Sequence, residues 1–244
     1  RFLLELFSKV DDLTDRDLVY YDNAMDMETC FDKYSFQEHK WHQTPNGDME
    51  WVYMLNRQGY LVDLAIAFYL TKKEKFFEKW KLIVFDFIET NEAEISHPEA
   101  SWRVLDAGIR LMNWIKSLTY LPLDKLTEVE KARIHDSMKK HADYIRSHLQ
   151  EKHLLSNWGV LAVSGLLSFV YFDTKELEMR EWAKKTLMQQ AALQFTPKGL
   201  HWEQSTLYHH EVVMCYAYLY QVAETLDNGD SDVWKNILRN PVQA

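Results

Sequence analysis

The chain has 244 residues, a formal net charge of -9 and 14% aromatic residues. Such a length can bury a substantial core, and because Gly and Pro are scarce and no linker-like tract appears, we expect one domain over residues 1–244. The acidic balance without a basic block argues against a nucleic-acid partner, and no run approaches the roughly 20 apolar residues of a membrane span. An anionic sugar stays compatible with this charge, since the local potential of a cleft matters more.

The first 45 residues or so are interpreted as an irregular lead-in. The mixed, acidic pattern over residues 2–18 predicts one helix, or a helix and a loop, whereas residues 25–41 are irregular and rich in aromatics. Pro45, Asn46 and Gly47 then give a turn signal, after which the pattern changes.

From residue 49 onward, apolar residues recur at helical spacing with short polar breaks between the runs. The predicted helices cover residues 49–70, 76–89, 102–119, 127–151, 157–171, 176–193 and 206–226, with a polar loop at 91–101 and a polar tail from Asn228. Amphipathic helices alternate with more apolar ones, which is typical of helical hairpins packed in series. The expected fold is all-α, an incomplete α/α toroid of helical hairpins; a single irregular helical bundle is the alternative.

Residues 198–216, KGLHWEQSTLYHHEVVMCY, carry a dense set of polar groups beside a predicted helix. They lie in a loop and the first turns of an apolar helix, where loops deliver side chains to a helix end. A helix that only fills a core would begin with a capping residue and a clean apolar stripe. We therefore expect groups for proton transfer and sugar binding here, among them His201, Glu203, Gln204, Tyr208 and His209.

Asn157 directly precedes an apolar run, in the stretch LSNWG at residues 155–159. Ser156 or Asn157 would serve as the N-cap of the helix that follows. Alternatively, the Asn157 amide would hydrogen-bond an anionic or carbonyl oxygen at the helix N-terminus, where the backbone dipole also favours negative charge. These residues by themselves leave both roles open.

Arginines form a second group of candidates. Arg103, Asp106, Arg110 and Asn113 recur three or four residues apart, so they share one helix face. Most such faces are solvated or internally paired. Otherwise a guanidinium group there would bind a carboxylate or sulfate through two hydrogen bonds, and on this interpretation Arg57 and Arg110 are candidate substrate-binding residues.

The sequence contains none of the usual motifs for metal binding, nucleotide binding or acyl transfer. The ten histidines include no HExxH pattern, and His209 and His210 point in different directions on a helix. There is no Gly-rich phosphate loop, GxSxG pattern or CxxC pair. We expect no catalytic metal and no cofactor, and Cys30 and Cys215 leave the redox compartment undecided.

Three segments together resemble the N-terminal helical domain of the heparinase II/III family of polysaccharide lyases. They are residues 51–65 (WVYMLNRQGYLVDLA), residues 102–114 (WRVLDAGIRLMNW), and the pair 156–159 (SNWG) with 199–209 (GLHWEQSTLYH). The resemblance runs from about residue 41 to residue 220, and the EQS-x-x-YH segment is its most specific part. It is greatest to the heparinase III, heparan-sulfate lyase branch, and Trp158 after Asn157 also favours that branch.

The resemblance implies an incomplete α/α toroid followed in the family by a largely antiparallel β-sandwich, which these 244 residues lack. It implies β-elimination at a uronic acid of heparan sulfate or a heparin-like glycosaminoglycan, incomplete without that C-terminal domain of the same protein. Asn157 matches the residue that hydrogen-bonds the uronate carboxylate, and Tyr208 matches the proton donor or acceptor. A catalytic His would come from the missing part. The remaining candidates, which would orient Tyr208 or line subsites, are His201, Glu203, Gln204 and His209.

Other interpretations stay open. An inverting glycoside hydrolase on an α/α toroid would use two carboxylates such as Asp106 and Glu203, about 6.5–9.5 Å apart in one cleft. A non-catalytic glycan-binding domain would use the surplus aromatics as stacking platforms, although aromatics also fill wide gaps between helices, and Tyr208 could be such an anchor. The resemblance implies a periplasmic or secreted protein, and a chain that begins at Arg1 is consistent with a removed leader.

Overall fold

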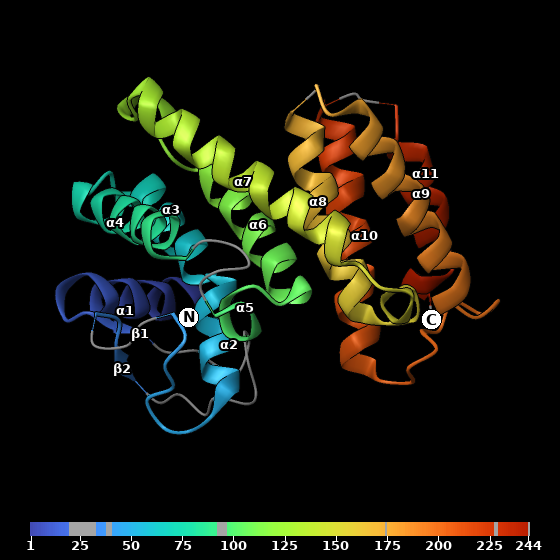
Figure 1. The fold of residues 1–244 in the computed structure, drawn as a ribbon, viewed down its shortest axis with the longest axis horizontal. Helices are drawn as coiled ribbons and strands as arrows, with labels where there is room; N and C mark the ends of the chain where they lie inside the picture. Colours follow the sequence, from blue (N-terminus) through green and yellow to red (C-terminus); the bar gives the residue numbers. More distant parts are fainter. Residues whose placement is uncertain (20–32, 38–40, 92–96, 174, 227–228, 244) are drawn as a thin grey trace. The chain divides into compact units, whose positions relative to one another are not determined.

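Most of the described chain is helical in the computed structural model, which describes residues 1–19, 33–37, 41–91, 97–173, 175–226 and 229–243. Its contacts divide the chain into two compact units, residues 1–140 and 141–244, and each is described by itself. The expectation of a single domain stays a prediction. The α-helices in the described ranges are α1 (Phe2–Asp15), α2 (Met49–Arg57), α3 (Tyr60–Thr71), α4 (Glu74–Thr90), α5 (Pro98–Ser101), α6 (Val104–Leu118), α7 (Glu128–His148), α8 (Asn157–Phe172), α9 (Leu177–Gln194), α10 (Thr206–Leu226) and α11 (Ser231–Leu238) (Figure 1).

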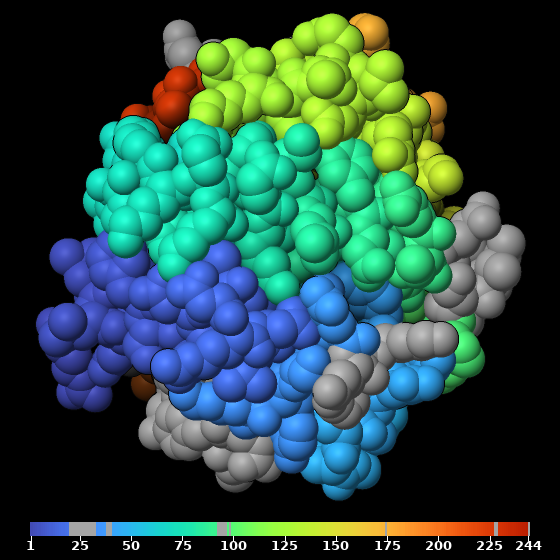
Figure 2. All heavy atoms as spheres, turned by 90° about the vertical axis from the view of Figure 1, so that its left-hand side faces the viewer, coloured from blue at the N-terminus to red at the C-terminus, as the bar shows by residue number. Residues whose placement is uncertain are grey.

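The first unit is organised around α3, which packs against α1, α4 and α6, while α2 packs against α5 and α6. Two short strands, β1 (Leu18–Val19) and β2 (Tyr34–Ser35), pair antiparallel beside α1. Ion pairs between Lys81 and Glu130 and between Glu89 and Arg133, each at 2.8 Å, join α4 to the first half of α7. Figure 2 shows the first unit from the left-hand side of Figure 1, with α4 in turquoise between α1 in blue and the start of α7 in light green.

Large aromatic side chains fill the interior of the first unit. The fully buried ones in its described part include Trp51, Phe76, Phe77, Trp80 and Trp114. Ring pairs link the helices: Phe68 of α3 contacts Phe77 of α4, and Phe87 of α4 contacts Trp114 of α6. Part of the aromatic surplus therefore packs the helical interior, as the alternative interpretation of the composition expects.

The helix predicted over residues 49–70 is wrong in one respect, because the structure divides it into α2 and α3. The break lies at Gln58, which takes a left-handed backbone conformation with φ of 55°, followed by Gly59. The buried Gln58 side chain accepts a 2.6 Å hydrogen bond from the Trp114 indole nitrogen on α6, which holds the turn. Apolar residues keep helical spacing on both sides of the break, so periodicity alone could not reveal it.

In the second unit, α8 packs against both α9 and α10, and α10 also packs against α11. Nearly every residue of α8 is buried, as its all-round apolar sequence predicts. The tail expected to be polar contains α11, which anchors itself through the buried Trp234. The Trp234 indole nitrogen donates a 2.8 Å hydrogen bond to the Tyr171 hydroxyl at the end of α8. A single aromatic anchor in a polar stretch gives too weak a periodic signal to predict this helix.

The remaining predicted helices are confirmed to within a few residues of their ends, and the all-α class is confirmed. Consecutive helices pack as hairpins in α3 with α4, α8 with α9, and α10 with α11. The short helix α5 lies inside the expected polar loop at 91–101. Among the described helices, none is long and apolar enough to cross a membrane. Cys30 and much of the aromatic stretch at 25–41 lie outside the described residues.

Candidate active site

Ser156, not Asn157, caps the N-terminus of α8. The Ser156 hydroxyl oxygen accepts a hydrogen bond from the backbone nitrogen of Trp158 at 3.2 Å, and Ser156 has the extended backbone conformation usual for this position. Asn157 is the first residue of the helix and is only 5% exposed. Its side chain is thus available for the second of the two roles that the sequence left open.

The Asn157 side chain pairs with Glu203, which the loop before α10 brings to the same place. Asn157 Nδ2 donates to Glu203 Oε2 at 2.6 Å, and the Asn157 backbone nitrogen donates to Glu203 Oε1 at 3.4 Å. The carboxylate therefore lies at the N-terminus of α8, where the helix dipole stabilises a negative charge. An amide nitrogen carries two hydrogens, so this pairing fixes the amide while one hydrogen stays available for another acceptor.

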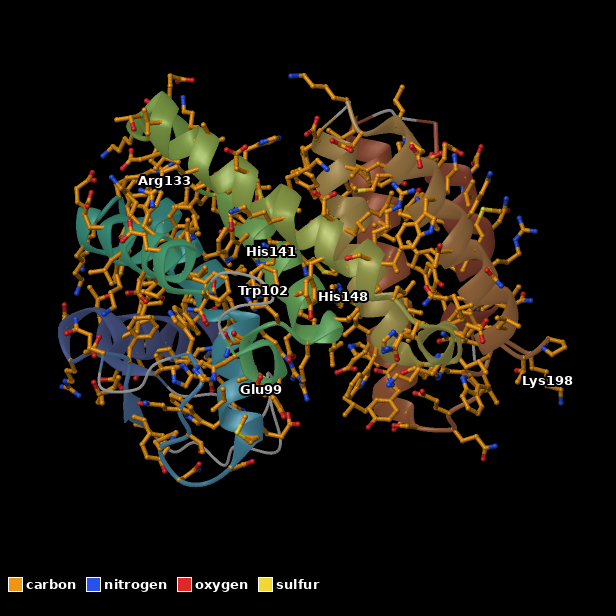
Figure 3. All side chains as sticks on the ribbon, viewed as in Figure 1. Glu99, Trp102, Arg133, His141, His148 and Lys198 are labelled. Atoms are coloured by element: carbon orange, nitrogen blue, oxygen red, sulfur yellow. The ribbon has the colours of Figure 1, made fainter. Side chains whose placement is uncertain are left out.

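A tight loop between α9 and α10 places Glu203. Phe195 and His201 form an antiparallel bridge across it, and the Trp202 backbone nitrogen donates to the Gln194 carbonyl at 2.8 Å. At the turn, Gly199 has φ of +87°, and an added Cβ would lie 2.5 Å from the Asn240 carbonyl carbon. Only glycine fits there without strain. Lys198 at the tip extends away from the helices (Figure 3).

Tyr208 lies in the first turn of α10. The chain turns at Gln204, which has φ of 56°, and Ser205 then begins the helix by accepting the Tyr208 backbone N–H at 3.3 Å and the His209 backbone N–H at 2.9 Å. The Tyr208 side chain is 41% exposed, and no described residue hydrogen-bonds its hydroxyl. The hydroxyl can therefore reach a bound molecule.

Two indole rings adjoin the Asn157 and Glu203 pair in sequence and are substantially exposed. Trp202 is 46% exposed, yet its indole nitrogen is tied to the Leu155 carbonyl at 2.8 Å, and Trp158 is 42% exposed. A fixed, exposed ring presents a flat apolar face, which suits the C–H groups of a pyranose. These two tryptophans are therefore candidates for a stacking surface beside the Asn157 and Glu203 pair.

His201 and His209 both make internal contacts. The buried His201 ring pairs through Nε2 with Gln194 Oε1 at 2.8 Å, and burial lowers the pKa of His201, with Glu203 opposing and His209 reinforcing that shift. His209 Nε2 lies 3.2 Å from the Pro241 carbonyl oxygen. Their predicted subsite roles stay untested, and their geometry favours holding the loop.

In the first unit, Arg57 and Arg103 converge on Asp106. Arg57 Nε donates to Asp106 Oδ1 at 2.8 Å and Arg103 Nε donates to Asp106 Oδ2 at 2.6 Å, while the carboxylate is fully buried. The Arg103 guanidinium also lies 3.2 Å from the Tyr53 ring centroid. This is the internally paired arrangement that the sequence left open, with the edge of Arg57 still partly exposed.

Arg110 is fully buried. Its Nη1 donates to the Asn56 carbonyl at 2.8 Å, and its guanidinium lies 4.3 Å from the Phe87 ring centroid and 5.0 Å from that of Trp102, which is labelled in Figure 3. A side chain so enclosed holds the core together, which argues against direct contact with a polysaccharide. Its substrate-binding role stays a prediction.

Sequence reasoning missed Gln194, the last residue of α9. It is fully buried and hydrogen-bonds both the N-terminal approach to α8 and His201. Gln190, one turn earlier and also fully buried, donates to the His153 carbonyl at 3.1 Å. Two glutamines four residues apart, on a helix face that also carries Ala183, Leu187 and Ala191, were the available signal. Within the described part of the chain, no group of three or more His, Cys, Asp or Glu side chains is placed to hold a metal.

Residues 5–237 match the family described as Heparinase II/III N-terminus. The chain belongs to this family. Its structure is similar to heparan sulfate lyase HepC from Pedobacter heparinus, with a TM-score of 0.77, 17% identity, and coverage of 98% of this chain and 37% of that one. A heparinase III structure matches with a TM-score of 0.74, 18% identity, and coverage of 98% and 38%.

These likenesses confirm the expected fold class, the helical N-terminal part of a heparinase-type lyase. A heparinase III gene product with methylated lysines gives the same picture, with a TM-score of 0.73 and 14% identity over 98% of this chain and 40% of that one. The chain thus spans about 37–40% of the length of the structures it matches. No match is found among curated protein sequences.

Proposed function

We propose that this chain is the helical domain of a polysaccharide lyase that cleaves a uronic-acid-containing glycosaminoglycan, of the heparan sulfate or heparin type, by β-elimination. Family membership supports the reaction class. The observation that carries the proposal is the placement of the Asn157 side chain. Ser156 caps the helix in its place, and Glu203 orients the Asn157 amide. A periplasmic or secreted location, and completion of the site by a C-terminal β-sandwich, belong to the same proposal.

The difficulty of the reaction lies in the C5 proton of the uronate, which is weakly acidic while the C6 carboxylate carries its charge. An enzyme must offset that charge, remove the C5 proton and assist departure of the C4 oxygen. The C5–H and C4–O bonds break, a C4=C5 double bond forms, and a proton passes to the leaving oxygen. No oxidant or reductant is required.

Asn157 and Tyr208 suit two of these tasks. The second amide hydrogen of Asn157, at the N-terminus of α8, would donate to the uronate carboxylate where the helix dipole also favours negative charge. The exposed Tyr208 hydroxyl would transfer the proton. Trp158 and Trp202 would stack on neighbouring sugar rings, and Arg57, Gln204 and His209 remain proposed subsite residues.

The hydrolase alternative loses support from the first unit. Asp106 is fully buried and both of its oxygens accept hydrogen bonds from arginines, so it is badly placed to protonate a glycosidic oxygen. The glycan-binding alternative keeps one favourable observation, the exposed indoles of Trp158 and Trp202. It predicts saturable binding without turnover.

The test is an ultraviolet assay for the conjugated unsaturated uronate, with heparan sulfate, heparin, chondroitin, hyaluronan and alginate as substrates. The chain is assayed alone and joined to its C-terminal region, and Asn157→Ala and Tyr208→Phe are compared with the control Tyr220→Phe on the same helix. We expect absorbance that collapses in the first two variants and persists in the control. New reducing ends without absorbance would establish hydrolysis instead, and binding without any product would establish the glycan-binding alternative.

A further inference from the structure

The Gln194 side chain joins three segments of the second unit. Its Nε2 donates to the Leu154 carbonyl at 2.8 Å and to the Ser156 carbonyl at 3.1 Å, so both amide hydrogens serve the approach to α8. Its Oε1 lies 2.8 Å from His201 Nε2. Reversing the amide would place Oε1 against two carbonyl oxygens, so the orientation is fixed by chemistry. An amide oxygen only accepts, and His201 Nε2 must therefore carry a hydrogen.

The other ring nitrogen of His201, Nδ1, carries no hydrogen in this neutral tautomer. Nδ1 is buried, has no hydrogen-bond partner among the described residues, and lies 3.9 Å from Glu203 Oε2. The His201 backbone nitrogen donates to His209 Nδ1 at 3.4 Å, which leaves His209 Nε2 as the donor to the Pro241 carbonyl. Within the described part of the chain, the titratable groups that act on His201 are Glu203 from its own loop and His209 from α10, and its partner Gln194 from α9 is uncharged.

The state of His201 decides which partners Glu203 has. While Nδ1 carries no hydrogen, Glu203 Oε2 is left to the Asn157 amide at 2.6 Å. A protonated His201 would direct a charged N–H donor at the same oxygen, because Nδ1 already lies within ion-pair distance of it. Glu203 would then turn toward His201, and Asn157 would lose the contact that orients it.

We propose that Gln194 and His201 are positioning residues for Asn157: Gln194 fixes the Nε2–H tautomer of His201, and the bare Nδ1 of that tautomer leaves Glu203 to orient the Asn157 amide. The inference rests on the proposed function of Asn157, but the contacts themselves exist without substrate. Burial lowers the pKa of His201, which keeps this histidine neutral at pH 7.

The test follows the Asn157 side-chain amide and the His201 ring nitrogens by ¹⁵N NMR between pH 4.5 and 8. We expect His201 to show the Nε2–H tautomer at pH 7, and the Asn157 amide signals to move in the same pH range in which His201 takes up a proton. In His201→Gln, whose amide still donates toward Gln194 but does not titrate, the Asn157 signals keep their pH 7 positions and that transition disappears.

The matched control is His153→Gln. His153 is another buried histidine next to α8 whose pKa is lowered by burial, but its Nδ1 accepts from the Gln150 backbone nitrogen. This variant should leave the Asn157 transition unchanged. Asn157 signals that ignore the titration of His201, or a His201 that is mainly the Nδ1–H tautomer, would overturn the inference.

The elimination assay separates this inference from the proposed function. In an active enzyme, the acid limb of kcat should move in His201→Gln while KM changes little, which a purely structural role would not produce. If no elimination occurs but the NMR coupling is present, the proposed function fails and the positioning of Asn157 stands. If elimination occurs without the coupling, only the positioning fails.

Discussion

The Asn157 amide donates a 2.6 Å hydrogen bond to Glu203 Oε2 across 46 residues of sequence, and this contact joins the N-terminus of α8 to the loop that leads into α10. Either residue by itself has a plain structural use, as a cap or as a solvated carboxylate. Together they form a charge-assisted pair with defined geometry at a helix N-terminus.

Replacing Asn157 by Asp should place two carboxylates where an amide and a carboxylate now meet. Like charges so close repel, so we expect a larger loss in the free energy of unfolding at pH 7 than the roughly 1–3 kcal/mol expected for Asn157→Ala, which only removes a hydrogen bond. The excess should shrink as the pH falls toward 4, because one carboxyl then takes up a proton. Urea unfolding of both variants at several pH values measures it; an excess that does not change with pH would contradict the pairing.

Gly159→Ala should destabilise the second unit. An added Cβ would lie 1.9 Å from the His153 carbonyl oxygen, a backbone atom that cannot rotate away. We expect a cost of about 1–3 kcal/mol or more from overpacking, despite the better helix propensity of alanine. The control is Ser164→Ala on the same helix, where a buried hydroxyl without a hydrogen-bond partner in the described chain is removed and stability should hold or rise. Thermal unfolding of the two proteins compares them.

Stability should fall as the pH drops below about 6.5, and His201 should contribute to the fall. Burial holds the pKa of His201 in the folded protein below its ordinary value of 6.5, so the unfolded chain binds more protons in that range and the free energy of unfolding rises with pH. Denaturant unfolding of His201→Gln between pH 5 and 7.5 should give a shallower slope than the unsubstituted protein. His153 has the same sign and accounts for part of the remaining slope. An unchanged slope would show that His201 titrates normally in the folded state.

Arg110→Ala should destabilise the first unit by roughly 2–4 kcal/mol, because the charged hydrogen bond to the Asn56 carbonyl and the contacts with the Phe87 and Trp102 rings are lost. If Arg110 acts only in the core, glycan binding should fall in proportion to the unfolded fraction. Arg57→Ala provides the comparison: it also costs stability, because the buried Asp106 loses one of its two arginine partners, but Arg57 is partly exposed, so binding should fall by more than the unfolded fraction explains. Binding titration beside circular dichroism separates the effects; weakened binding by a fully folded Arg110→Ala protein would restore the substrate-binding role.

Much of the fold could be predicted because apolar spacing along each helix is a local property of the sequence. The predicted helix at 206–226 matches the bounds of α10, and the all-round apolar run at 157–171 is the buried α8. The break at Gln58 could not be predicted, since its left-handed turn depends on a hydrogen bond from Trp114, 56 residues away. Helix α11 was hidden for a similar reason, because its stability depends on burying Trp234 next to Tyr171.

The sequence by itself determined the helical class, the resemblance to heparinase-type lyases, and the two residues proposed for catalysis, because periodicity and short motifs are written in neighbouring residues. Only the tertiary structure decided which polar side chains meet. Ser156 caps α8, Glu203 accepts a hydrogen bond from Asn157, Gln194 pairs with His201, and Arg110 lies in the core. The physical reason is that a hydrogen bond requires a donor and an acceptor about 3 Å apart. That proximity is created by the packing of helices distant in sequence, and no local pattern encodes it.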